Sequence, residues 1–103
     1  MGNSVLVLPI EAIVSDPNIR GGRPIIVGTG ITVMDIATAK VFHGQEADGI
    51  AEWYELTLSQ VYAALAYYYD HKAEIDSSIR DRRARADILK EQILARQPPS
   101  LLP

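Results

Sequence analysis

The stretch TVMDIATAKVFHGQEADGIAEWYELTLSQVYAALAYYYDH, residues 32–71, decides the fold. It predicts a first helix over Thr32–His43 and a second over Glu46–Trp53, each ended by turn-forming residues. A third helix is predicted to begin at Thr57 and to extend for about four turns. Two short helices followed by a third after so tight a turn indicate a helix-turn-helix, an arrangement that often reads DNA.

The third helix carries the clearest local signals. Thr57-Leu-Ser-Gln60 has the sequence of a capping box, in which the two side chains accept hydrogen bonds from each other's backbone amides. Its predicted core stripe consists of Leu58, Val61, Tyr62, Leu65, Tyr68 and Tyr69. Its predicted outward face consists of Ser59, Gln60, Ala63, Ala64, Tyr67 and Asp70. The small residues on that face would let another backbone, or a DNA groove, approach closely.

The first two helices have apolar faces at helical spacing. In the first helix this face is formed by Val33, Ile36, Ala37 and Val41, and in the second by Ala47, Ile50, Ala51 and Tyr54. The single tryptophan, Trp53, is expected to anchor the core.

Two β features are predicted before the helices. Val5–Leu8 reads as a short strand that is covered either by its own domain or by a strand from a second copy. Ile25–Val27 and Ile31–Val33 flank a glycine-containing turn and predict a small hairpin. The predicted fold class is therefore mainly α with a small N-terminal β segment, a tri-helical helix-turn-helix core and a long C-terminal helix.

The long C-terminal helix is predicted over Lys72–Gln97, which contains neither glycine nor proline, with a break near Asp76-Ser-Ser78. Its thin apolar stripe would need a partner surface to be stable in water. The predicted division of the chain is 1–33 for the β segment and hairpin, 34–76 for the helix-turn-helix core, and 77–103 for a helical arm and tail.

The net charge of -3 is unevenly distributed. Residues up to Asp76 include four basic and ten acidic side chains, whereas those from Ser77 onward include six basic and three acidic. An acidic body with a basic tail indicates two interaction surfaces. The acidic body counts against binding a phosphate backbone by itself, because that affinity comes mostly from Lys and Arg.

Composition also bounds the location and the chemistry. Without cysteine, a basic leader or an apolar run of roughly 20 residues, the chain is expected to be cytoplasmic and not to contact a membrane. His71 and Glu74 have a spacing that could hold a metal, but one His with one or two carboxylates falls short of a zinc site. No Ser or Cys nucleophile lies in a recognisable setting. We therefore expect no enzyme, no cofactor and no metal.

A set of residues in the order of a known family runs from about Ile13 to Ile79, some two thirds of the chain. The set comprises Asp16-Pro-Asn-Ile-Arg-Gly-Gly-Arg-Pro24, Gly28-Thr29, Val33, Gly44, Leu56-Thr57, Val61, Ala64, Tyr67, His71 and Glu74-Ile75. In these residues the chain resembles the VapB-type antitoxin-like family, formerly a domain family of uncharacterised function. The resemblance implies a helix-turn-helix of the tri-helical type, dimers or higher oligomers, repression of its own operon, and a PIN-like ribonuclease toxin as partner.

Two sets of site residues are predicted, and the toxin-binding set rests on the position and character of the tail, which lies outside the resemblance. Operator DNA would be bound by Arg20, Arg23, Lys40, Thr57, Ser59, Gln60, Ala63 and Tyr67. The toxin would be bound by Arg80, Arg82, Arg83, Arg85, Ile88, Leu89 and Ile93. Val27 and Gly30 stand where the family commonly has basic residues, which removes two positive charges from the region expected to face DNA.

Two alternatives stay open. The arginines of residues 80–85 could form a solvated helix face, a toxin-binding arm or a contact to DNA phosphates. The helix-turn-helix could be degenerate, so that the protein is a structural oligomerisation or interaction module that does not bind DNA.

Overall fold

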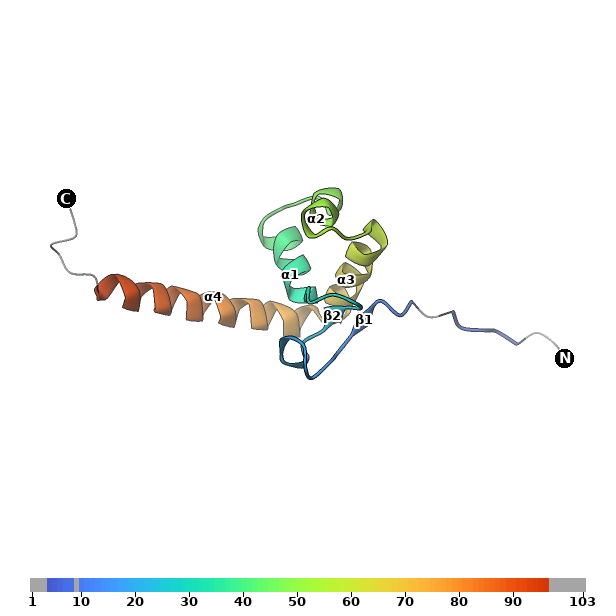
Figure 1. Ribbon diagram of the computed structural model, residues 1–103, viewed down its shortest axis with the longest axis horizontal. Coiled ribbons are helices and arrows are strands. Elements are labelled where there is room, and N and C mark those ends of the chain that lie inside the picture. The colour runs from blue at the N-terminus through green and yellow to red at the C-terminus, as the bar shows by residue number, and fades with distance from the viewer. Residues whose placement is uncertain (1–3, 9, 97–103) are drawn as a thin grey trace. The chain divides into compact units, whose positions relative to one another are not determined.

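The computed structural model describes residues 4–8 and 10–96. The chain divides into two units, one ending at His71 and the other beginning at Lys72. The first unit contains β1 (Ile13–Val14), the 3-10 turn η1 (Arg20–Gly22), β2 (Ile25–Ile26), α1 (Val33–Ala37), the π-helical turn η2 (Thr38–Phe42), α2 (Ala47–Tyr54) and α3 (Leu58–Asp70). The second contains α4 (Lys72–Ala95). The described chain is mainly helical with a small N-terminal antiparallel sheet, which confirms the predicted fold class (Figure 1).

The first helical segment begins at a buried threonine. Thr32 is 1% exposed, and its hydroxyl accepts a hydrogen bond from the Asp35 amide at 3.0 Å. The Asp35 carboxylate accepts one from the Thr32 amide at 3.1 Å, so the capping box is complete. The segment changes to π-helical spacing in η2 and ends before Gly44, whose φ is +64°. The expected helix over Thr32–His43 is therefore present as α1 followed by η2.

The small sheet pairs different strands from those expected. Ile13 lies opposite Ile26 and Val14 opposite Ile25, so the main partner of β2 is β1. Of the predicted hairpin, the described residues form one isolated β-bridge, between Ile25 and Thr32. It cannot extend further because Thr32 leaves the sheet to cap α1.

The predicted strand over Val5–Leu8 does not form within a single chain. These four side chains are 76–91% exposed, and the residues form no strand. A strand requires a neighbour for its backbone groups, and in the described residues β2 is paired with β1 on one side and bridged to Thr32 on the other. The β-branched, apolar composition of the segment is therefore not sufficient to give it a place in the sheet.

The core of the first unit lies between α1, α2 and α3. α3 packs against both other helices and against β1. The largest fully buried side chains here include Ile36, Ile50, Val61 and Tyr68. The two isoleucines of β2 are also buried, so the sheet closes one side of the helical core.

The predicted core stripe of α3 is displaced around the helix. Tyr62 and Tyr69 are each 57% exposed and Leu58 is 45% exposed, whereas Ala64 is fully buried. The buried face consists of Val61, Ala64, Leu65 and Tyr68. An alanine in this face allows close packing of helices, while tyrosine can remain at a surface because its hydroxyl is hydrated.

Trp53 does not anchor the core. Its side chain is 78% exposed, and α2 instead buries Ala47, Ile50 and Ala51. Because each residue turns a helix by about 100°, Trp53 lies well away from the centre of that buried face.

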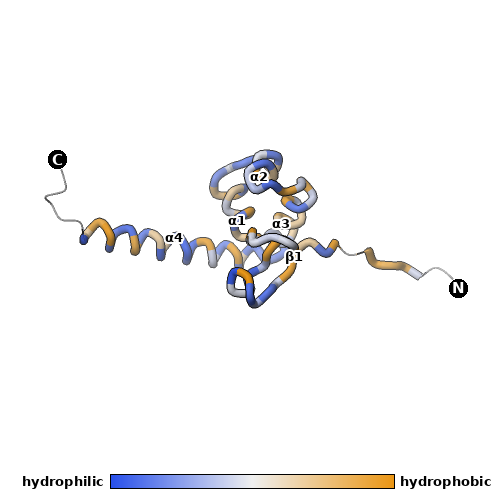
Figure 2. The backbone as a smooth tube through the Cα atoms, in the orientation of Figure 1, coloured by the Kyte–Doolittle hydropathy of each residue, from blue (hydrophilic) through white to orange (hydrophobic). Residues whose placement is uncertain are grey.

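α4 is a continuous helix of 24 residues, so the predicted break near Asp76-Ser-Ser78 is wrong. Its first turns contain an ion pair between Lys72 and Asp76, spaced i to i+4. Ile79 is 2% exposed, and every residue from 80 to 96 is exposed. Figure 2 shows hydrophobic and hydrophilic residues alternating along this helix.

Replacing Ile50 by alanine tests the position of the core. Ile50→Ala removes a fully buried side chain and should lower the free energy of unfolding by about 3 kcal/mol. Trp53→Ala, a larger truncation at an exposed site, should change it by less than about 0.5 kcal/mol. Urea denaturation followed by circular dichroism measures both. A larger loss for Trp53→Ala would contradict this packing.

Replacing Thr57 by alanine tests the start of α3. Thr57→Ala removes the hydroxyl that accepts the Gln60 amide hydrogen bond and should cost about 1 kcal/mol. Ser59→Ala, two residues further along, makes the comparable change inside the helix and should be nearly neutral. Thermal unfolding compares the two variants, and equal melting temperatures would exclude the capping contribution.

Candidate functional site: the helix-turn-helix surface and the arm

The connection between α2 and α3 is a three-residue turn. Glu55 ends α2 in the left-handed conformation, with φ 56° and ψ 46°. The amide of the following Leu56 donates to the Ala51 carbonyl at 2.8 Å, which satisfies one of the last carbonyls of α2. Thr57 then caps α3. This turn gives the tri-helical unit its helix-turn-helix geometry.

Two of the side chains predicted to contact DNA already form hydrogen bonds within the protein. The Thr57 hydroxyl accepts a hydrogen bond from the Gln60 amide at 3.1 Å. The Gln60 side-chain oxygen accepts one from the Thr57 amide at 2.8 Å. These side chains fix the start of α3, and a base contact by either would compete with the capping box.

The other α3 residues that are predicted to contact DNA differ in their exposure to solvent. Ser59 is exposed, whereas Ala63 is half-buried. Tyr67 is also half-buried, and its ring stacks on that of His71 with the centroids 4.1 Å apart and an interplanar angle of 18°. Ring atom Nδ1 of His71 lies 3.0 Å from the Tyr67 carbonyl oxygen, which holds the two residues together at the end of α3. On α3, Ser59 is therefore the predicted contact best placed to meet a base.

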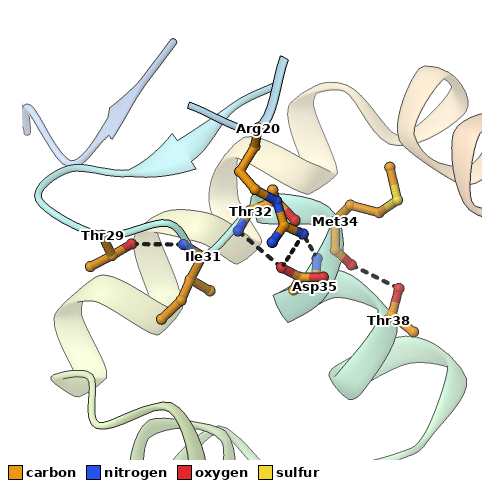
Figure 3. A network of polar contacts seen from close by, with 7 residues as sticks. All are labelled: Arg20, Thr29, Ile31, Thr32, Met34, Asp35 and Thr38. Atoms are coloured by element: carbon orange, nitrogen blue, oxygen red, sulfur yellow. Dashed lines mark hydrogen bonds and ion pairs between the residues drawn. The ribbon is translucent and has the colours of Figure 1, made fainter. Parts of the chain in front are cut away.

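Two of the three predicted cations of the first unit lie close to carboxylates. The guanidinium of Arg20 is 3.6 Å from the Asp35 carboxylate, and the Lys40 ammonium is 3.9 Å from that of Glu46. Figure 3 shows Arg20 above the capping box of Thr32 and Asp35, where it joins η1 to the start of α1. Arg23 is exposed beside η1. Pairing with the protein's own carboxylates reduces the attraction of Arg20 and Lys40 for a phosphate backbone.

The sequence places Ser59 and Asp70 on the outward face of α3, and both are exposed, but it misses an apolar strip on that face. The strip is formed by Leu58, Tyr62, Ala66 and Tyr69, which recur at spacings of four, four and three residues and are all exposed. The periodicity assigned three of them to the core because it counted tyrosine and leucine as apolar. The acidic residues Glu55 and Asp70 stand just before and just after this face, and both are exposed.

The predicted toxin-binding residues all lie on α4. Ile88, Leu89 and Ile93 are 54%, 57% and 51% exposed, and the four arginines between residues 80 and 85 are exposed as well. Leu89 and Ile93 are four residues apart and therefore project from the same side of the helix. This segment presents both charge and apolar surface to a partner.

Among residues 4–8 and 10–96, no three His, Cys, Asp or Glu side chains cluster in a way that could hold a metal ion. Within the same residues, the helices are too short or too polar to span a membrane.

The described chain thus combines a helix-turn-helix unit with an exposed helical arm. The model of a family described as "Protein of unknown function (DUF433)" matches residues 13–68, which is more than half of the chain. The protein belongs to this DUF433 family. The match ends within α3, so α4 lies outside it. Neither the curated proteins nor the solved structures compared with this chain include a match.

Proposed function

We propose that this protein is an antitoxin-like component of a type II toxin-antitoxin system, which acts in the cytoplasm and neutralises a PIN-like ribonuclease through α4. The observation that supports this proposal is the exposed arm. From residue 80 to residue 96 every side chain is exposed, including Ile88, Leu89 and Ile93. Helices that expose large apolar residues in this way gain stability when a partner's groove covers them.

The chemistry of the arm suits the active site of such a nuclease. PIN-like enzymes have acidic, metal-binding active sites, so an arginine from the segment 80–85 could bind their carboxylates in place of the metal. Leu89 and Ile93, one to two turns further along, would fill an adjoining apolar groove. The two kinds of contact lie on one rigid helix, which fixes the distance between them.

A second candidate function concerns the helix-turn-helix. Instead of repressing an operon, it could serve as an interaction module that does not bind DNA. The outward face of α3 supports this candidate, because it presents Tyr62, Tyr69 and Leu58 where a DNA reader usually presents polar and basic side chains. Two of the three cations in the first unit also lie near its own carboxylates.

Truncation and substitution of the arm test the first proposal. Co-expression with the product of the adjacent gene should give a complex that is lost when the chain is cut after Ile79. Leu89→Asp should also abolish co-purification, because it places a charge in the apolar contact. Ser77→Asp, the same charge at an exposed position that precedes the arginine segment and lies about 120° around α4 from Leu89, should leave the complex intact. A complex that survives truncation after Ile79 would show that the arm is not the binding element.

The second candidate is tested by a mobility-shift assay on the DNA upstream of the gene. We expect no retained complex even at low salt, because the body is acidic and its α3 face is apolar. Binding whose affinity falls steeply as salt rises would instead establish a DNA reader. In that case Arg23→Ala should weaken binding and reduce its salt dependence.

A further inference from the structure

The outward face of α3, Leu58, Tyr62, Ala66 and Tyr69, is an exposed apolar strip, on which the Tyr69 ring contacts that of Tyr68 with the centroids 5.0 Å apart. Leu58 is 45% exposed, and the two tyrosines are 57% exposed. Ala66 between the tyrosines leaves room for another helix to approach. Leucine and tyrosine without charged neighbours inside the strip are typical of the core of a protein interface.

Carboxylates bracket this strip. Glu55 lies in the turn three residues before Leu58, and Asp70 directly follows Tyr69. Both are exposed, and neither forms an ion pair within residues 4–8 and 10–96. An occupant with an apolar centre and a cation at each end would therefore complement the strip.

The distal part of α4 has that pattern. Arg85, Ile88, Leu89, Gln92 and Arg96 recur at i, i+3, i+4, i+7 and i+11, so they project from one side of the helix. Ile88 and Leu89 are 54% and 57% exposed. The two arginines are about 16 Å apart along the axis, the same separation as between Leu58 and Tyr69 on α3.

A chain cannot place this part of the arm on its own α3. Arg85 lies about 20 Å along the axis of α4 from its first residue, because a helix rises about 1.5 Å per residue. The whole of α3, with 13 residues, has the same length. Even an α4 that ran straight back along α3 would reach the far end of α3 at Arg85, so that Ile88, Leu89 and Arg96 would lie beyond it.

We propose that the distal face of α4, from Arg85 to Arg96, binds the outward face of α3 of a second copy of this chain. Exchange of both arms about a two-fold axis forms the contact twice and leaves neither surface unpaired. From residue 77 onward each chain has three more basic than acidic residues, so two arms repel each other. The basic arm and the acidic ends of the α3 face attract each other instead.

This contact does not depend on the proposed toxin. Leu89 belongs both to the distal arm face and to the proposed toxin-binding surface, so the two partners compete for α4. A chain that self-associates without binding a toxin, or binds a toxin as a monomer, would separate the two proposals.

Charge exchange tests the contact with the full-length chain. One variant carries Arg85→Glu and Arg96→Glu, and the other carries Glu55→Lys and Asp70→Lys. Sedimentation equilibrium should show a dimer for the unaltered chain and self-association weakened roughly tenfold or more for each variant alone, because like charges then face each other. An equimolar mixture should dimerise, since each acidic arm finds a basic α3 face and each basic arm an acidic one.

Circular dichroism of each variant reports whether it folds, and recovery in the mixture shows that both partners were competent. Lys90→Glu, which changes one charge on another side of α4, should leave self-association unchanged. A monomeric unaltered chain would overturn the proposal. So would unaltered dimerisation of the Glu55→Lys, Asp70→Lys variant, which would instead indicate pairing between arms.

Discussion

The start of α3 is the constraint on which the helical unit depends. Thr57 and Gln60 exchange two hydrogen bonds that make Leu58 the first helical residue. Each residue turns the helix by about 100°, so this start also fixes the side chains that face α1 and α2. A start one residue earlier or later would turn the fully buried Tyr68 away from the core. The left-handed Glu55 ends α2 close enough for the cap to follow after one residue.

The parts of the fold that depend on neighbours in sequence could be predicted, and those that depend on distant partners could not. The capping boxes at Thr32 and Thr57 each involve two residues that are three apart, so the local sequence is sufficient to predict where each helix begins. β1 is only two residues long and takes its place from β2, eleven or more residues away. Val5–Leu8 has a stronger β composition but no strand to join. Composition alone cannot distinguish these two cases.

The candidate site could be predicted in its charge but not in its shape. The acidic body and the basic arm follow directly from the sequence, and the arm's cations and apolar residues are exposed. The apolar strip on the outward face of α3 was hidden because tyrosine suits either a core or a surface, and only packing decides between them. The sequence nevertheless contains a conflict. It predicts both a capping box and base contacts for Thr57 and Gln60, and one side chain cannot readily serve both purposes.

The arm determines which partners are possible. A helix that leaves Ile88, Leu89, Ile93 and Leu94 more than half exposed gains roughly 1 kcal/mol or more for each that a partner covers. Any apolar surface that covers these side chains gives the same gain, whereas the surrounding arginines favour surfaces that are acidic as well as apolar. The α3 face with Glu55 and Asp70 is such a surface, and so is the groove beside a nuclease's metal-binding carboxylates. The two proposals therefore invoke one recognition chemistry, and a chain whose arm is held by its copy must release it before the arm can bind a toxin.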